Sequence, residues 1–212
     1  KFSATGEYIY MIGGQVTKTK AGEPGATEPE ENICTAASGD ACRVGIAGSG
    51  EGQFERSGEN RIAVAADDSF YVGDATRVQH FSSSGAFLDE VVLADIEGLP
   101  GRTLQGRGLA PDGVLYLAFG QNFTLENAEV PFVYRVDPAT EELVDAIEVP
   151  FAKHLATDSA GNLYAAVVEK HPSRYEIAKV DSAGVRQPPN VESPDSQELE
   201  INGLASSGAC GV

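Results

Sequence analysis

The 212-residue chain is long enough for one sizeable domain or a small repeat array, and 42% of its residues are hydrophobic, enough to build a core. Its formal net charge of −17 opposes binding to nucleic acid or anionic lipid and favours cations or basic partners. No apolar run approaches the length of a membrane-spanning helix, so no membrane span is expected. The 24 glycines and 11 prolines favour many short strands and turns over long helices.

The first residues are predicted to be strands. Residues 2–9, Phe-Ser-Ala-Thr-Gly-Glu-Tyr-Ile, match residues 81–88 further along the chain. Residues 1–12 are therefore interpreted as the outer strands of a repeat unit. Residues 13–58, rich in Gly, Glu, Thr and Pro, interrupt the pattern and are interpreted as an insert loop. The part at 13–50 is a candidate contact surface, and the alternative is a tolerated insertion.

The insert carries two of the three cysteines, Cys34 and Cys42. Their separation is too long for a redox pair of the C-x-x-C type, and two thiols without a nearby histidine make a poor zinc site. We expect a disulfide that staples the loop, which suits an oxidising compartment. The alternative is two unpaired thiols. Cys210 has no obvious partner.

An internal repeat follows the insert. Three segments share an apolar strand, an Asp/Gly turn and a strand with a tyrosine, and the tyrosines Tyr71, Tyr116 and Tyr164 are spaced 45 and 48 residues apart. That period fits a four-stranded propeller blade. The predicted fold class is all-β, with residues 1–212 forming a β-propeller segment of about four blades. The expected units are three blades at 59–93, 104–149 and 152–187, and the start of a further blade at 199–212.

Two interpretations of the chain ends remain open. The termini complete one shared blade and close a small ring, or the chain is an excerpt of a larger ring. The excerpt is favoured because the last segment, 199–212, offers little beyond one strand. Open blades would expose unpaired edges, and such edges recruit strands.

Five motifs follow one another in the first unit: Gly48-Ser49-Gly50-Glu51-Gly52-Gln53-Phe54, Ile62-Ala63-Val64, Tyr71-Val72-Gly73-Asp74, Arg77-Val78-Gln79-His80-Phe81 and Gly85-Ala86-Phe87-Leu88. They resemble the NHL-repeat family of β-propellers. The cysteine loop followed by the G-Q-F segment also resembles predicted secreted NHL proteins of actinobacteria. The match covers about residues 48–93 and weakens in the later units. The resemblance implies a ring that is usually six-bladed. It does not fix a function, because the family spans adhesive, sensor, RNA-binding and lyase types.

Candidate site residues lie where the innermost strands are expected to begin, around the propeller axis. Several are cationic in an acidic protein and could hold an anion such as a carboxylate. This speculative axial ring consists of Asn60, Arg61, Arg107, Lys153, His154 and Asn202. The alternative is that these side chains pair with local Asp and Glu. The histidines His80, His154 and His171 are not expected to converge, so no catalytic residue, metal or cofactor is predicted.

The sequence therefore predicts a non-enzymatic interaction or scaffold module, extracellular or on the cell surface. It would bind a protein partner, or assemble with copies of itself, through the insert at 13–50 and open blade edges. The alternative is a small anionic-ligand or enzyme site on the axis.

Overall fold

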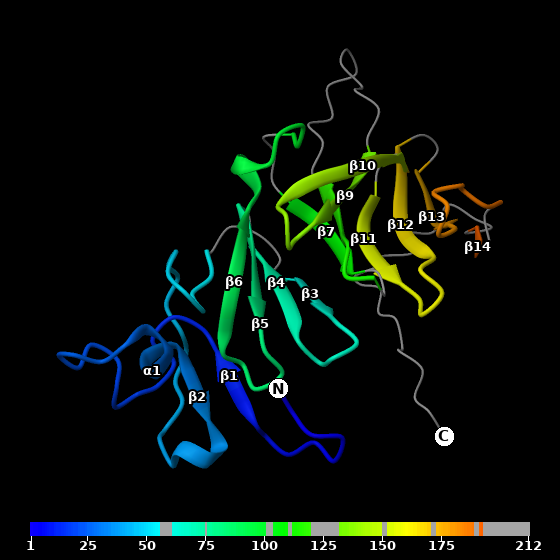
Figure 1. Cartoon of the computed structure of the whole chain (residues 1–212). Coiled ribbons are helices and arrows are strands. Elements are labelled where there is room, and N and C mark those ends of the chain that lie inside the picture. The colour runs from blue at the N-terminus through cyan, green and yellow to red at the C-terminus, as the bar shows by residue number, and fades with distance from the viewer. Residues whose placement is uncertain are drawn as a thin grey trace.

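A computed structural model describes residues 1–55, 61–74, 76–100, 104–109, 112–119, 132–149, 152–170, 173–188 and 191–192. The described strands form three four-stranded antiparallel sheets and one two-stranded sheet (Figure 1). Each four-stranded sheet runs in simple chain order, as hairpins joined by tight turns require. The all-β class predicted from the repeat, with four-stranded propeller blades, is confirmed. Within this part of the chain no helix is long and apolar enough to cross a membrane.

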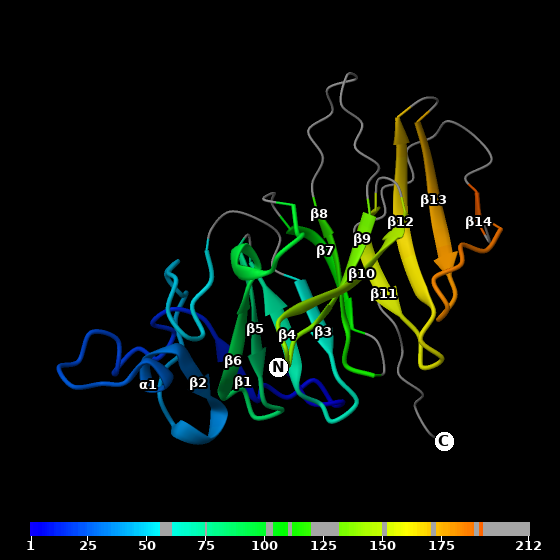
Figure 2. The ribbon, with the colours of Figure 1, turned by 45° about the horizontal axis from the view of Figure 1, so that its top comes forward.

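The three sheets are here named blades. Blade 1 contains β3 (Arg61–Val64), β4 (Phe70–Gly73), β5 (Arg77–Phe81) and β6 (Phe87–Val92), followed by the short 3-10 turn η2 (Leu93–Asp95). Blade 2 contains β7 (Leu104–Leu109), β8 (Leu115–Phe119), β9 (Phe132–Asp137) and β10 (Glu142–Glu148). Blade 3 contains β11 (Ala152–Thr157), β12 (Leu163–Lys170), β13 (Ser173–Val180) and β14 (Val191–Glu192). The first strands β3, β7 and β11 lie side by side (Figures 1 and 2).

The core lies between the blades. One buried cluster joins blades 1 and 2 and includes Tyr71, Leu109, Leu115 and Leu117. A second cluster joins blades 2 and 3 and includes Tyr116 together with residues of β11, β12 and β13. Each of these tyrosines therefore packs toward the following blade, and the repeating tyrosine marks the surface on which that blade is stacked.

Aspartates fix the turns. In the first turn of blades 1, 2 and 3, respectively, Asp67 accepts a backbone N–H from Ser69, Asp112 from Val114 and Asp158 from Ala160, at 3.0–3.2 Å. Asp137 and Asp181 do the same in the last turns of blades 2 and 3. Aspartate is favoured here because its short carboxylate reaches the backbone two residues on.

The N-terminal region differs from the expected pattern of outer strands followed by a loop. Strand β1 (Tyr10–Ile12) pairs with β2 (Ile33–Thr35), which lies inside the predicted insert. The insert also contains α1 (Glu28–Asn32) and the 3-10 turn η1 (Ala36–Ser38). Tyr10 packs this region on blade 1: its hydroxyl donates to the carbonyl of Ser83 at 3.1 Å. The start of a further blade expected at 199–212 lies outside the described residues.

Two glycines of β7, Gly106 and Gly108, lie at the interface between blades 2 and 3. A Cβ added to Gly106 would lie 2.5 Å from the carbonyl oxygen of Lys153, whereas one added to Gly108 meets its nearest atom at 3.6 Å. Gly106→Ala should therefore lower the free energy of unfolding by about 1–3 kcal/mol, because backbone must move. Gly108→Ala is the matched control and should change it by no more than about 1 kcal/mol, in the stabilising direction. Urea unfolding of both variants measures this, and equal effects would contradict the packing described.

Candidate functional site

The disulfide expected in the insert is present and joins Cys34 to Cys42. It connects β2 to the segment that returns toward blade 1. Tyr8 donates a hydrogen bond to the carbonyl of Cys34 at 2.7 Å, and Thr17 forms an isolated β-bridge with Cys42. The insert is thus cross-linked to itself and to the N-terminal strands, so that its surface is held in shape.

Arg77 on β5 joins the end of the insert to blade 1. Its buried guanidinium donates to the carboxylates of Asp74 at 3.3 Å and Glu90 at 2.6 Å. It also donates to the backbone carbonyls of Gly50 and Gln53, at 3.0 and 3.1 Å. Arginine suits this position because its planar fork carries five donors, and here it serves two carboxylates and two carbonyls together.

The nearby Gln79 also joins the end of the insert to blade 1. Its side chain is fully buried, donates to the carbonyl of Gln53 at 2.6 Å and accepts the N–H of Gly52 at 2.8 Å. Phe54 then meets the buried ring of Phe81, with ring centroids 6.2 Å apart. The glycine-rich G-Q-F segment and the R-V-Q-x-F strand are therefore two halves of one contact, which docks residues 50–54 on β5.

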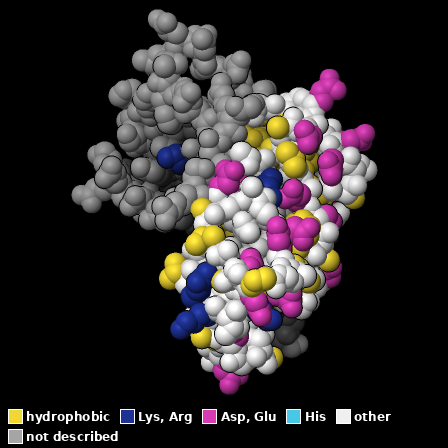
Figure 3. Space-filling model, turned by 90° about the vertical axis from the view of Figure 1, so that its left-hand side faces the viewer, with side chains coloured by type: hydrophobic (Ala, Val, Ile, Leu, Met, Phe, Trp, Pro, Cys, Tyr) yellow, Lys and Arg dark blue, Asp and Glu magenta, His cyan; other side chains and the backbone are white. Residues whose placement is uncertain are grey.

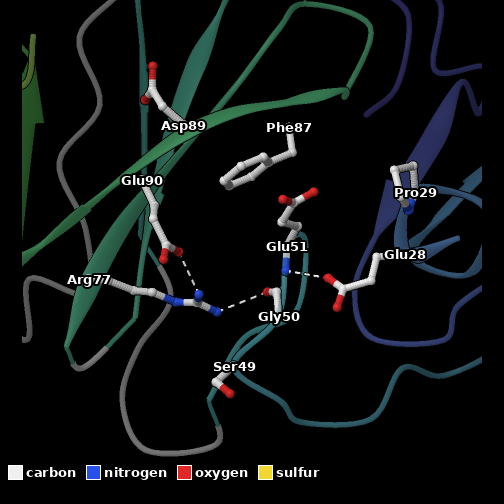
Figure 4. Close-up of a pocket in the computed structure, with 9 residues that line it drawn as sticks. All are labelled: Glu28, Pro29, Ser49, Gly50, Glu51, Arg77, Phe87, Asp89 and Glu90. Carbon is white, nitrogen blue, oxygen red and sulfur yellow. Dashed lines mark hydrogen bonds and ion pairs between the residues drawn. The ribbon is translucent and has the colours of Figure 1, made fainter.

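This docking leaves an open groove between the insert and the outer strands of blade 1. It has a volume of about 620 Å³. It is lined by Glu28, Pro29, Ser49, Gly50, Glu51, Arg77, Phe87, Asp89 and Glu90 (Figure 4). The carboxylate of Glu51 extends from the insert toward Phe87 (Figure 4).

Negative charge dominates the groove. Four of its lining residues are acidic and one is basic, and that one, Arg77, is already bonded to two carboxylates. Glu28 is fixed on α1 and accepts the N–H of Glu51 at 2.7 Å. Acidic side chains also extend over this face of the molecule from its top to its base (Figure 3). The groove therefore combines an aromatic ring with carboxylates, a combination that attracts cationic groups.

The start of α1 is fixed by hydrogen bonds between neighbouring residues of the chain. The carboxylate of Glu30 accepts the N–H and the hydroxyl of Thr27, both at 2.8 Å. These hydrogen bonds lower the pKa of Glu30. A capping carboxylate of this kind holds the first turn of a short helix, and here it holds Glu28 at the edge of the groove.

The structure describes only part of the predicted axial ring. Asn60 and Asn202 lie outside the described residues, and Arg61 is described by its backbone alone. Arg107 is buried and donates to the carbonyl of Gly73 in β4, so its guanidinium lies between blades 1 and 2. Lys153 is exposed, with its backbone carbonyl against Gly106, and His154 is buried.

Strand register explains the position of Arg107. The first hairpins pair Val64 with Phe70, Leu109 with Leu115 and Thr157 with Leu163. Arg107 therefore corresponds to Ile62. The apolar pattern of the sequence aligns Arg107 with Asn60, which lies two residues further from the turn. The observed register places Arg107 within the interface between two blades.

A second polar array lies on blade 1. His80 Nε2 is 3.1 Å from the hydroxyl of Ser69, and His80 Nδ1 is 3.4 Å from Asp89. The order resembles a hydrolase triad, but Ser69 is buried and donates its hydroxyl proton to Asp67 at 2.6 Å. The hydrogen bonds from Ser69 lower the pKa of Asp67, because they stabilise its ionised form. The array ties the first turn of blade 1 to β5 and does not prepare a nucleophile.

The sequence matches no protein-family model, and the search of curated proteins returns no significant match. Solved structures give remote likenesses. Hydrazine synthase of Kuenenia stuttgartiensis has 17% identity and a TM-score of 0.45, over 63% of this chain and 35% of that one. A protein of unknown function from Bacteroides caccae has 14% identity and a TM-score of 0.42, over 66% and 48% of the two chains.

A third likeness is to a gluconolactonase of Xanthomonas campestris, with 15% identity and a TM-score of 0.44, over 76% of this chain and 55% of that one. The chain thus spans from about a third to just over half of the length of these three structures. What these proteins bind or catalyse is not carried over to this chain.

Sequence reasoning singled out Arg77, Gln79 and Phe87 only as motif positions, and did not assign them to a site. The groove was missed because it depends on a contact between residues 50–54 and β5. The available signal was polar: Arg77 and Gln79 alternate on a strand with buried neighbours, so their side chains needed partners from another segment.

Because Arg77 joins the insert to blade 1, substitution of Arg77 should cause a large loss of stability. Arg77→Met leaves the buried carboxylate of Asp74 without its ion pair and should cost about 3–5 kcal/mol of unfolding free energy. The more exposed pair of Arg135 and Asp145 provides the control, and Arg135→Met should cost at most about 1 kcal/mol. Unfolding in guanidinium chloride, followed by circular dichroism, compares the two variants. Similar losses of unfolding free energy would show that Arg77 does not hold the insert on blade 1.

Proposed function

We propose that the chain is a non-enzymatic binding module whose contact surface is the insert together with the outer strands of blade 1. The observation that carries this proposal is the acidic groove. Its walls come from two segments that a disulfide, Arg77 and Gln79 hold in a fixed relation. A preformed surface loses less conformational entropy on binding than a mobile loop does.

The chemistry of the groove favours a basic partner segment. Glu28 and Glu51 are exposed, and Phe87 offers a half-buried ring in the same groove. A lysine or arginine side chain could place its alkyl stem on the ring and its charge near the carboxylates. The overall charge of −17 would also steer such a segment toward the protein.

We further infer membership of the NHL-repeat group and an extracellular or cell-surface location. The docking of the G-Q-F segment on the R-V-Q-x-F strand supports the first, because it gives both motifs a common structural role. The disulfide supports the second, because such bonds persist in oxidising compartments.

A short peptide of alternating lysine and glycine is the test ligand for the groove. We expect it to bind, to lose affinity as salt is raised, and to bind several-fold more weakly to Glu51→Lys and to Phe87→Ala. Glu142→Lys on β10 is the control, since it makes the same change of charge at an exposed position away from the groove. Isothermal titration calorimetry measures all four proteins. Equal weakening by Glu51→Lys and Glu142→Lys would show that only net charge matters and would reject the groove.

A further inference from the structure

Strand β6 is the outermost strand of blade 1, and only one of its two edges is paired. Its partner is β5, with Gln79 opposite Glu90 and Arg77 opposite Val92. The main contacts of β6 among the described strands are likewise with β5. The outer edge of β6 therefore presents backbone N–H and C=O groups, and such groups pair readily with another extended chain.

The hydrogen-bond pattern identifies the residues that present these groups. Leu93 donates its N–H to the carbonyl of Thr76, so these two residues form a hydrogen-bonded pair of the antiparallel ladder. Hydrogen-bonded and non-hydrogen-bonded pairs alternate along such a ladder. Val92 and Glu90 therefore belong to non-hydrogen-bonded pairs, and their N–H and C=O groups point away from β5. The groups of Val91, between them, point toward β5.

The same part of β6 faces the groove. Arg77 and Gln79 bond to the end of the insert, so their side of β5 is the side that the insert covers. Residues directly opposite one another in an antiparallel pair share one side of the sheet. Glu90 therefore lies on the insert side, and so does Phe87, which is opposite Phe81. Glu90 and Phe87 both line the groove, which thus adjoins the free edge of β6 (Figure 4).

A strand added at this edge would direct its side chains in a defined way. The residue paired with Glu90 would place its side chain on the groove side, with the two Cβ atoms about 4.5–5.5 Å apart. Every second residue of the added strand would follow on the same side, toward Phe87. The carboxylates of Glu28, Glu51 and Glu90 outnumber the single arginine of the groove. Charge complementarity therefore selects an extended segment with a basic residue at every second position.

We propose that the partner of the groove is an extended peptide with lysine or arginine at every second position, which pairs with the outer edge of β6 as a fifth strand of blade 1. This inference rests on the proposed function, because the groove supplies the selection for charge. It adds the role of the main chain: Glu90 and Val92 fix the register of the peptide by hydrogen bonds, and the groove contacts its alternate side chains.

Two N-methylated forms of the alternating lysine–glycine peptide test the backbone pairing. The residues opposite Glu90 and Val92 would be lysines, so the lysine N–H groups would bond to β6 and the glycine N–H groups would point to solvent. N-methylation of the lysines should weaken binding about tenfold or more, and N-methylation of the glycines should change it less than about threefold. Isothermal titration calorimetry measures all three peptides, which carry the same charge.

The outcomes separate this inference from the proposed function. A peptide that binds equally well in all three forms, or that both modifications weaken equally, would overturn strand addition and leave the groove as the binding surface. A peptide that binds in none of the three forms would reject the groove as well.

Amide hydrogen exchange, followed by NMR, tests the same contact on the protein. The amides of Glu90 and Val92 should exchange rapidly in the free protein and become protected when the unmethylated peptide binds. The amide of Val91 already faces β5 and should not change. Strand β10 is the control, because it is also the outermost strand of its blade and none of its residues lines the groove. Binding without new protection at Glu90 and Val92 would overturn the proposal.

A proline substitution removes one of the proposed donors from β6. Val92 has a φ of −86°, close to the value that proline imposes, and its N–H does not face β5. Val92→Pro should therefore keep its circular dichroism spectrum and bind the unmethylated peptide about tenfold more weakly. Val92→Ala keeps the N–H and should bind as the unsubstituted protein does. Equal affinities of a folded Val92→Pro variant and of Val92→Ala would contradict pairing at this edge.

Discussion

The arrangement of the N-terminal half depends on the hydrogen bonds of one guanidinium. Arg77 is buried, and its charge is stabilised only because Asp74, Glu90 and two backbone carbonyls surround it. A buried cation without such partners would be very costly, so the partners and the cation specify one another. Residues 50–54 cannot leave β5 without exposing these groups, and the position of the insert, α1 and the groove follows from that constraint.

The blades depend on a different constraint, which is the space between neighbouring innermost strands. Gly106 and Gly108 allow β11 to approach β7 until Leu155 and Thr157 reach them. The tyrosine beside each small residue extends the apolar surface outward along the blade. Packing is thus made by large residues of one blade against small residues of the blade before it. On β3 the corresponding large residues, Ile62 and Val64, are exposed.

Much of this fold could be predicted from sequence because its signals are local. The tyrosine period, the Asp turns and the alternation of apolar residues each lie within a single hairpin, and they gave the blades. The pairing of β1 with β2 was not predictable in the same way, since Ile33-Cys34-Thr35 is too short to stand out and its partner lies more than twenty residues away. The loop disulfide was predictable because its two cysteines share one short loop.

The candidate sites were harder to predict because they depend on register. Arg107 was placed at the mouth of the axis by an alignment of apolar residues, and hairpin pairing moved it two residues deeper, where it bonds to Gly73. Aspartates contribute to the acidity and also hold the turns, yet Asp112 and Asp137 need only one side-chain oxygen for that purpose. Asparagine supplies the same oxygen without the charge. Net charge can therefore drift in evolution, one turn at a time, while the architecture stays unchanged.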